Sequence, residues 1–294
     1  MTEESTTSSQ ATQLLLGQYQ LNAVCGEGST SIVYEATHTI LNRTLAVKVL
    51  RQECSDRLSM QAFQCEAQTS SSLPHPNIVA ACDCGMTTSG QPFIVSEYVP
   101  GGSLADRIKQ SQSLPNNQVI EIFIQICAAL EYVHKRGFVH RSVNVTKIMF
   151  EKPGDKLITK LIGFSRAKKI KEPGNEIDNL ANSGQADHQA RRFSLYMSPE
   201  HAHGKEVDGR ADIYATGCTM YQALTGEIPL KGENVYHTIQ KHLTETPVPM
   251  AALRRDLKIN KDLENIVSKA MQKDPSDRFQ SMSEMVKALE KIRR

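Results

Sequence analysis

The sequence predicts an α+β fold with two lobes, a small β-rich lobe followed by a larger α-helical one. Over residues 17–99, β-branched and apolar residues occur in short runs separated by Gly-rich or Asn-Arg turns, a pattern typical of strands. Beyond "PGG" at residues 100–102 the apolar period becomes helical. We therefore place the lobe boundary at residues 99–100. A ligand site is expected in the cleft between the lobes.

The first lobe is predicted to hold strands around one helix. Its β-branched and apolar runs predict strands over residues 19–30, 31–38, 44–50 and 92–99. Between them, "LSMQAFQCEAQTSSS" at residues 58–72 predicts a helix, because Phe63 and Ala67 lie four residues apart. The segment "PHP" at residues 74–76 ends that helix.

The second lobe carries three apolar stripes at helical spacing. The first spans residues 119–133, where apolar members recur at offsets 0, 3, 4, 7, 8, 11 and 14. The other two stripes consist of Leu263, Ile266, Val267, Ala270 and Met271, and of Met282, Met285, Val286 and Leu289. The last of them follows a predicted capping box of Ser281 and Glu284.

Composition limits the classes of function. The 294 residues carry 34 Lys and Arg against 32 Asp and Glu, and this net charge of +2 gives no global field to recruit nucleic acid or an anionic membrane. No apolar run approaches the about 20 residues of a membrane span, and the N-terminus lacks a basic-then-apolar signal pattern. We expect no nucleic-acid partner, no membrane partner and a cytoplasmic location.

The cysteines and the N-terminal residues have simple interpretations. The seven cysteines form no C-x-x-C pair, and "CDC" at residues 82–84 has no second pair near it. Free thiols in a reducing compartment are therefore favoured over a zinc site. Residues 1–16 are mostly polar and rich in Ser and Thr, so we predict a disordered tail, followed by one domain over residues 17–294.

Several motifs follow one another along the chain in a recognisable order. They are "GEGSTSIVY" (26–34), "LAVKVL" (45–50), "IVSEYV" (94–99), "VHRSVNVTKIMF" (139–150), "LIGFSRAKK" (161–169), "YMSPE" (196–200), "RADIYATGCTMYQALTG" (210–226) and "KDPSDRF" (273–279). In this order and at these separations they resemble the motifs of a serine/threonine protein kinase of the bacterial eukaryotic-like type. The resemblance covers residues 17–294 and implies a bilobal protein-kinase-like fold.

The resemblance also implies a nucleotide site. Glycines in the first motif let backbone N–H groups approach phosphates, and a lysine inside the next strand would hold them, paired with a glutamate of the following helix. The implied binding residues are Gly26, Gly28, Val33, Ala46, Lys48, Glu66, Glu97, Val99 and Met149. Most of them have a plain structural alternative: a tight hairpin for the glycines, a structural ion pair for Lys48 and Glu66, and ordinary core for Val33, Ala46 and Met149.

The positions that carry the family's chemistry are changed. In the family pattern H-R-D-x-K-x-x-N, Ser142 stands at the position of the base Asp and Asn144 at that of the lysine. Lys147 and Gly163 replace the two metal ligands, and Phe193 replaces a threonine of the activation segment. The architectural positions match, and they include Asp212 in the central helix and Glu200, which is expected to pair with Arg278.

Each change removes a contribution to phosphoryl transfer. A hydroxyl is a poor base without an activator, and a positioned general base is worth about 10²–10⁴ in rate. A cation at position 147 repels a divalent ion by roughly 8 kcal/mol at about 4 Å and an effective dielectric of about 20. No neighbouring acid offers a rescue, because Asp155 is expected in the turn after the loop strand, outside the cleft.

These changes favour a pseudokinase that acts as a nucleotide-binding or protein-interaction module in signalling. The expected cofactor is ATP without Mg²⁺, with Lys147 contacting the phosphate oxygens in place of the metal; a pseudokinase that binds no nucleotide is the alternative. The expected partner is an unidentified protein, with an active kinase or its substrate as candidates. The alternatives are an active ATP-dependent serine/threonine kinase with an atypical site, a nucleotidyl transferase, and a misaligned loop, which the motifs on both sides disfavour.

Residues 163–200 resemble the activation segment. The stretch is long and hydrophilic, which predicts a mobile loop. Phosphorylation of Ser194 or Ser198 by another kinase is one hypothesis, with Arg141, Arg191 or Arg192 as anion partners. An inert loop is the favoured alternative.

Overall fold

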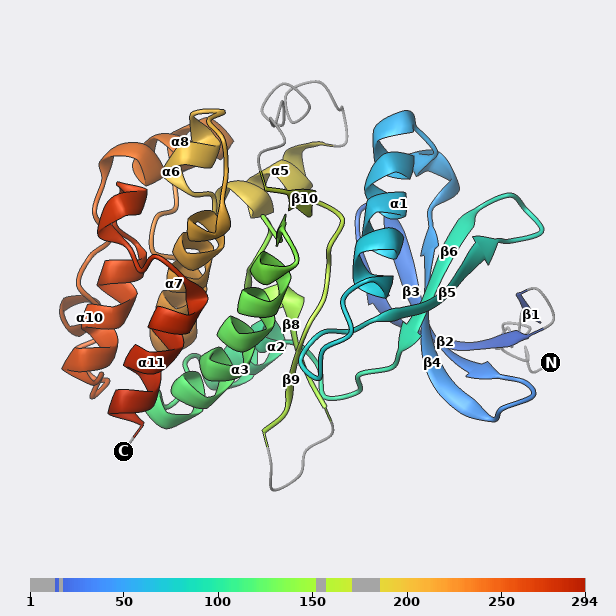
Figure 1. The fold of residues 1–294 in the computed structure, drawn as a ribbon, viewed down its shortest axis with the longest axis horizontal. Coiled ribbons are helices and arrows are strands. Elements are labelled where there is room, and N and C mark those ends of the chain that lie inside the picture. The colour runs from blue at the N-terminus through green and yellow to red at the C-terminus, as the bar shows by residue number, and fades with distance from the viewer. Residues whose placement is uncertain (1–13, 16–17, 152–156, 171–185, 294) are drawn as a thin grey trace, which may run out of the picture. The chain divides into compact units, whose positions relative to one another are not determined.

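The computed structural model describes residues 14–15, 18–151, 157–170 and 186–293 (Figure 1). Most of the predicted tail and Asp155 lie outside the described residues. Leu14–Leu15, inside the span predicted to be tail, forms strand β1. The chain divides into two units, Met1–Met60 with Ala81–Tyr98 and Gln61–Ala80 with Val99–Arg294.

The first unit is a six-stranded antiparallel sheet with strand order β1-β2-β3-β4-β6-β5. After β1, its strands are β2 Tyr19–Glu27, β3 Ser31–His38, β4 Arg43–Leu50, β5 Ala81–Met86 and β6 Pro92–Glu97. On β4, Leu45, Val47 and Val49 are buried, whereas Ala46 and Lys48 between them are partly exposed. This alternation places the core on one face of the sheet.

The sequence predicts four of these strands but not β5. This strand lies at the edge of the sheet, and most of its residues are exposed, so it lacks the apolar alternation that would reveal it. It carries Cys82 and Cys84 as exposed free thiols. Between them, Asp83 accepts a hydrogen bond of 2.5 Å from the Tyr19 hydroxyl. Among the described residues, no group of three or more His, Cys, Asp or Glu side chains could hold a metal ion.

The second unit is helical. Helix α1, Arg57–Ser71, lies where predicted, and the boundary between the units falls within it. The other helices are α2 Leu104–Ser111, α3 Asn116–Lys135, α5 Ala186–Ser194, α6 Pro199–Ala202, α7 Gly209–Thr225, α8 Val235–Thr244, α9 Met250–Leu253, α10 Lys261–Ala270 and α11 Met282–Ile292. Two short antiparallel pairs join β7 Phe138–Val139 to β10 Lys168–Lys169, and β8 Ile148–Phe150 to β9 Thr159–Leu161.

The three predicted stripes form the core of this unit. In α3, Val119, Ile122 and Phe123 are fully buried, and the helix packs against α7 and α11 (Figure 1). Helix α7 is buried almost all round, as expected for a central helix. Gly217 permits the close approach of α10, because a Cβ at this position would lie 2.8 Å from Cγ of Met271.

The predicted capping box before α11 forms only in part. The Ser281 hydroxyl accepts from the Glu284 amide at 3.2 Å, as predicted. The Glu284 carboxylate, however, accepts from the Gln280 amide at 2.8 Å, one residue earlier than a capping box requires. A complete box that the sequence analysis missed opens α2, where Ser103 and Asp106 satisfy each other's amides.

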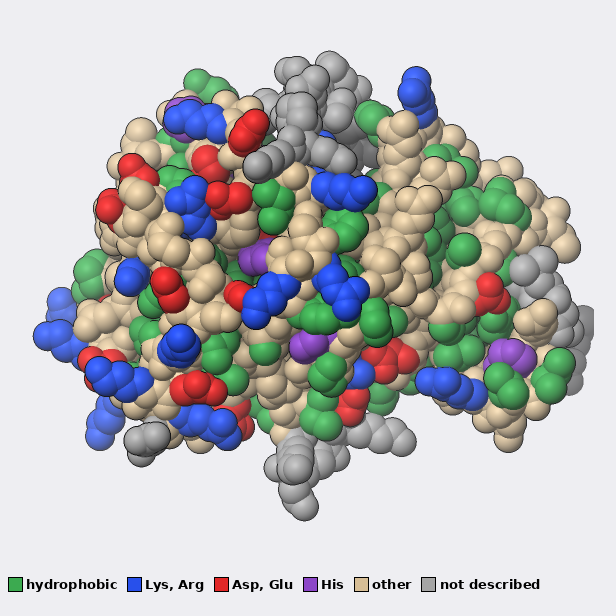
Figure 2. Space-filling model, in the orientation of Figure 1, with side chains coloured by type: hydrophobic (Ala, Val, Ile, Leu, Met, Phe, Trp, Pro, Cys, Tyr) green, Lys and Arg blue, Asp and Glu red, His purple; other side chains and the backbone are tan. Residues whose placement is uncertain are grey.

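The predicted α+β class, with a β-rich part followed by a helical part, is confirmed. On the face drawn in Figure 2, Lys and Arg side chains are interspersed with Asp and Glu over the helical unit. Within the described ranges, no helix combines the length and the apolar character that a membrane crossing requires.

Candidate functional site

A buried carboxylate organises the loop at residues 139–147. Asp212, in the first turn of α7, is fully buried. It accepts hydrogen bonds from the backbone amides of His140 (2.9 Å) and Arg141 (2.8 Å), and its Oδ2 lies 2.7 Å from Nε2 of His134. Burial raises the pKa of Asp212, but the hydrogen bond and charge of His134 and the loop contacts outweigh it, so the pKa is lowered overall.

This anchor explains an unusual backbone at Arg141. Its φ is +65°, in the left-handed region that a residue with a side chain rarely adopts. Such a conformation costs about 1–3 kcal/mol and persists only where the surroundings hold it. Here the hydrogen bonds from the backbone amides of His140 and Arg141 to Asp212 hold this conformation. The Arg141 guanidinium also lies 3.2 Å from Nε2 of His201.

His140 is a neutral, buried support for the loop. Its Nδ1 accepts from the Ser142 amide at 3.3 Å, so its proton resides on Nε2, which faces the Ile162 carbonyl at 3.2 Å. Burial lowers the pKa of His140, and the charge of Lys147 contributes in the same direction. The ring also packs edge-on against Phe164, with centroids 4.7 Å apart.

The side chain of Ser142 bonds to Gly163, and that of Asn144 bonds within the loop itself. The Ser142 hydroxyl donates to the Gly163 carbonyl at 3.2 Å and also lies 3.3 Å from His140 Nδ1. The Asn144 carboxamide donates to the Ser142 carbonyl at 2.9 Å and accepts from the amide and hydroxyl of Thr146 at 2.8 and 2.7 Å. Asn144 therefore stabilises the turn at Val145–Lys147.

The Lys147 side chain fills the space in which a side chain at position 163 would lie. Gly163 has φ +88°, and a Cβ built on it would lie 2.7 Å from Cδ and 2.8 Å from both Cε and Nζ of Lys147. The lysine side chain therefore passes directly over the Gly163 backbone. The two segments are also joined by a bond from the Ile162 amide to the Lys147 carbonyl, 2.9 Å long.

The prediction of a mobile loop is wrong for residues 186–194, which form α5. Residues 171–185 lie outside the described part of the chain. Phe193 of α5 packs into a cluster with Met197 and Ala202, together with Ile239 and Leu243 of α8. The Arg166 guanidinium lies 4.2 Å from the centre of the Phe193 ring. Long-range packing of a hydrophilic segment, which its composition does not reveal, overrides the loop tendency.

The two candidate phosphorylation sites are buried. Ser194 is fully buried, and its hydroxyl donates to the Arg191 carbonyl at 2.9 Å. Ser198 is 2% exposed. Another kinase could reach neither hydroxyl without first unpacking this part of the chain.

The predicted pair of Glu200 and Arg278 is confirmed as a bidentate ion pair. Its two N–O distances are 2.8 and 2.7 Å, and the side chains are 9% and 0% exposed. The remaining Arg278 donors reach the carbonyls of Gln272, Arg210 and Lys273. Full satisfaction of this kind is what a buried ion pair needs in order to be tolerated.

Several predicted nucleotide-binding residues share one face of the sheet. Val33 on β3 lies opposite Lys48 on β4, and Ala46 lies opposite Ser96 on β6. Directly opposed residues point to the same side, and residues two apart on a strand do so too. Gly26 and Gly28 lie where β2 turns into β3, and the Gly28 amide donates to the Ser31 carbonyl at 2.8 Å. Glu97 ends β6, opposite Leu45.

The other three predicted binding residues belong to the helical unit. Glu66 lies on α1, and its charge opposes the lowering of the His140 pKa. Met149 lies on β8, opposite Lys160. Val99 begins the segment that leads to α2 and is partly buried.

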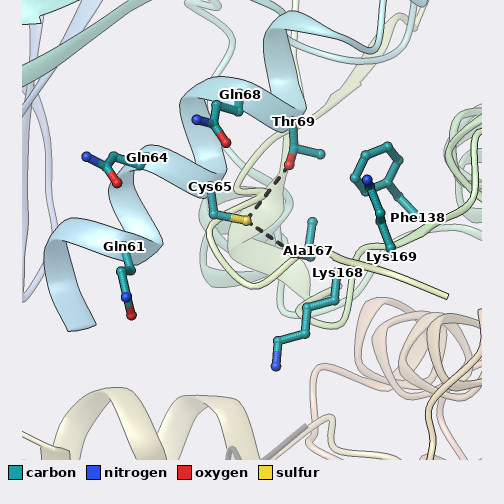
Figure 3. Close-up of a pocket in the computed structure, with 9 residues that line it drawn as sticks. All are labelled: Gln61, Gln64, Cys65, Gln68, Thr69, Phe138, Ala167, Lys168 and Lys169. Atoms are coloured by element: carbon teal, nitrogen blue, oxygen red, sulfur yellow. Dashed lines mark hydrogen bonds between the residues drawn. The ribbon is translucent and has the colours of Figure 1, made fainter. Parts of the chain in front are cut away.

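A further cavity of about 240 Å³, which sequence reasoning did not predict, lies beside α1 in the helical unit (Figure 3). The Cys65 thiol donates to the Ala167 carbonyl at 3.1 Å. The other lining residues are Gln61, Gln64, Gln68, Thr69, Phe138, Lys168 and Lys169. In the sequence, the three glutamines signal only a solvent-facing helix side.

The sequence model of the protein kinase domain matches residues 19–289. The chain belongs to the protein kinase family. It is similar to the serine/threonine-protein kinase PknB of Mycobacterium leprae, with 36% identity over 275 residues that cover 92% of this chain and 42% of that protein. PknB of Mycolicibacterium smegmatis is 36% identical over 277 residues, covering 93% and 42%. The kinase domain described here thus spans less than half the length of these relatives. The predicted resemblance to bacterial serine/threonine kinases and the bilobal kinase fold are confirmed.

The Mg²⁺ ions that serve this family do not fit the residues present. The family holds them with the loop asparagine and the aspartate of D-F-G. In this kinase domain these positions are Lys147 and Gly163, a cation and a residue without a side chain. The lysine also fills the space into which a ligand at position 163 would extend. The helical unit therefore provides neither of the two ligands through which the family binds metal.

Proposed function

We propose that this kinase domain is a pseudokinase, a catalytically inactive module that regulates a protein partner. The observation that carries the proposal is the position of Lys147 over Gly163, which replaces two metal ligands by one cation. Metal ions supply several kcal/mol of charge stabilisation in phosphoryl transfer. Ser142 also supports the proposal, because its hydroxyl is a poor proton acceptor and already donates to the Gly163 carbonyl.

His140 does not activate Ser142 as a base. Nδ1 of the histidine lies 3.3 Å from both the Ser142 amide nitrogen and the Ser142 hydroxyl, so the amide competes with the hydroxyl for this one acceptor. Burial lowers the pKa of His140, so the ring disfavours the proton that an activating base would take up. A Ser–His pair in this setting organises the loop.

An active kinase with an atypical site is the second candidate. The observation that favours it is the intact loop backbone, in which the amides of His140 and Arg141 bond to Asp212. The predicted phosphate-binding Lys48 and its predicted partner Glu66 are also present. Nucleotidyl transfer is less favoured, because it too normally depends on metal ligands.

Transfer from radiolabelled ATP distinguishes these candidates. The chain is incubated with ATP labelled at the γ or the α phosphate, with Mg²⁺ or Mn²⁺, and with a generic acceptor protein. We expect counts at background, equal to those of a Lys48→Met variant. Transfer of γ label that Lys48→Met abolishes would instead establish the active kinase, and transfer of α label would establish nucleotidyl transfer.

A catalytically inactive module acts through the protein that it binds. We propose a cytoplasmic protein, with an active kinase or its substrate as candidates, because an inactive kinase domain acts in signalling through binding. Co-purification of the chain from its native cell, followed by mass spectrometry, tests this. Recovery of no protein beyond that found with an unrelated bait would contradict it.

A further inference from the structure

The space over Gly163 is already filled by the chain itself. Real Cβ atoms essentially never approach another heavy atom closer than 3.0 Å, yet a Cβ at this glycine would meet three atoms of Lys147 at 2.7–2.8 Å. These atoms include the last two methylenes and the ammonium nitrogen. A side chain at position 163 and the present position of Lys147 therefore exclude each other.

The backbone keeps the two residues in register. Strands β8 and β9 pair with Ile148 opposite Leu161, so Lys147 and residue 162 follow at the end of the same ladder. The Ile162 amide donates to the Lys147 carbonyl at 2.9 Å. On the other side, the Ser142 hydroxyl donates to the Gly163 carbonyl at 3.2 Å. Because hydrogen bonds hold both backbones, any adjustment has to come from the lysine side chain.

The lysine brings a positive charge to the place that the family gives to a metal. Its charge is felt at the neighbouring buried His140, whose pKa it helps to lower. An ammonium donates hydrogen bonds to phosphate oxygens as a compact point charge. It also repels a divalent cation, roughly twice as strongly as it repels a single charge.

We infer that Lys147 and Gly163 form an interlocked pair, in which the lysine ammonium is a binding site for a nucleoside polyphosphate that carries no metal ion. This inference rests on the proposed function, since it describes what an inactive kinase domain binds. Mg²⁺ weakens binding, because the metal and the lysine compete for the same phosphate oxygens. The two positions are therefore coupled in their effect on metal binding. An acid placed at position 163 displaces the end of Lys147 and pairs with its ammonium, and an amide placed at position 147 finds no second ligand.

A double-mutant cycle tests the interlock without any ligand. Gly163→Ala is measured with Lys147 intact and in a Lys147→Ala background, by thermal unfolding. Any strain of alanine at positive φ is common to both backgrounds, so the difference isolates the contact. We expect Gly163→Ala to lower Tm by at least about 2 °C more when Lys147 is present. Equal shifts in the two backgrounds would overturn the interlock.

Gly137→Ala is the matched control. This glycine has φ +79°, close to that of Gly163, but nothing lies within 4 Å of its Cβ position. Its substitution therefore reports the backbone strain alone. The expected Tm shifts of Gly137→Ala and Lys147→Ala are additive.

Calorimetric titration with ATP, in EDTA and then in excess Mg²⁺, tests the ligand. The unmodified chain is expected to bind ATP in EDTA and to bind it about tenfold more weakly in Mg²⁺, the size of one charge-assisted hydrogen bond. Lys147→Asn is expected to lose about tenfold in EDTA. Gly163→Asp gains no binding in Mg²⁺, whereas Lys147→Asn combined with Gly163→Asp does. Exposed Lys205→Asn, with the same charge change, leaves every value unchanged.

Three results would overturn the ligand assignment: no ATP binding in either buffer, unchanged binding by Lys147→Asn in EDTA, or a gain in Mg²⁺ by Gly163→Asp alone. The radiolabel assay judges the proposed function separately. If the unmodified chain transfers phosphate, the proposed function fails, while the double-mutant cycle still decides whether the two residues interlock.

Discussion

The scaffold around Asp212 and the loop that it holds keep the kinase pattern to very different degrees. Asp212, Glu200 and Arg278 match the family: Glu200 and Arg278 form the predicted pair, and Asp212 accepts from two backbone amides of the loop. Ser142 and Lys147, in contrast, have changed type, and both side chains lie against Gly163. The comparison shows that the amides of His140 and Arg141, bonded to Asp212, hold one end of the loop, while the new side chains of Ser142 and Asn144 add hydrogen bonds of their own. The reactive side chains are not needed to hold it, so they could change without loss of the fold.

The largest effect is expected where the scaffold itself is broken. Arg278→Ala leaves the Glu200 carboxylate buried without its partner and removes donors from three carbonyls. Breaking a buried pair from one side costs about 3–5 kcal/mol, which denaturant unfolding measures. The control Arg293→Ala removes an exposed ion pair with Glu121, in which the side chains are 57% and 45% exposed, and is expected to change stability little. A similar loss of stability in both variants would mean that the buried pair of Glu200 and Arg278 contributes no more than an exposed pair.

Phe193 tests whether a position of the family's chemistry now serves packing. Phe193→Thr restores the residue type of the family but opens the cluster with Met197 and Leu243. The expected loss is about 2–4 kcal/mol, together with faster hydrogen exchange over α5. Phe193→Leu keeps most of the apolar volume and should lose clearly less. If threonine is tolerated as well as leucine, the ring does not hold α5.

The contribution of Asp212 to stability is expected to depend on pH. Burial raises its pKa, but the hydrogen bond and charge of His134 and the loop contacts lower it overall below the ordinary value of 3.8. The ionised carboxylate therefore stabilises the fold above that value, and its contribution is lost as pH falls through the lowered folded-state pKa.

Asp212→Asn should cost about 2–3 kcal/mol near neutral pH. The variant should also lose less stability than the unmodified chain as pH is lowered below 3.8, because it has no carboxylate to protonate at this site. Urea unfolding at a series of pH values measures both effects. Parallel curves for the two proteins would mean that Asp212 does not carry this part of the acid sensitivity.

The smallest effect is expected in the loop. Ser142→Asp restores the residue type of the family base, but it replaces a hydroxyl that donates to the Gly163 carbonyl by an acceptor. Stability should fall by about 1 kcal/mol, and phosphate transfer should stay at background because the metal ligands are still missing. Ser142→Ala separates the lost hydrogen bond from the added charge. Transfer by Ser142→Asp above the level of Ser142→Ala would show that the base was the only missing part.

Sequence reasoning performed differently for the two units and for the loop. It located four strands and α1, because their apolar patterns are local. It missed the edge strand β5, whose exposed residues carry no such pattern, and it interpreted α5 as loop. At the start of α11, the Glu284 carboxylate accepts from the Gln280 amide and not from the Ser281 amide that the predicted capping box requires.

The candidate site divides in the same way. The residue types at positions 142, 144, 147 and 163 can be read directly from the motifs, and so can the absence of both metal ligands from these positions. The mutual exclusion of Lys147 and a side chain at Gly163 could not be predicted, because the two residues are distant in sequence and meet only through the pairing of β8 with β9. The burial of Ser194 and Ser198 likewise depends on packing from other segments.

By itself, the sequence determined the kinase family, the α+β class and the loss of the reactive residue types, since residue identity and local periodicity carry that information. Only the tertiary structure decided which space Lys147 fills, how Asp212 holds Arg141 in a left-handed backbone, and that residues 186–194 form a packed helix. These features arise from contacts between residues far apart along the chain, and the steric and electrostatic consequences of such contacts exist only once the chain has folded.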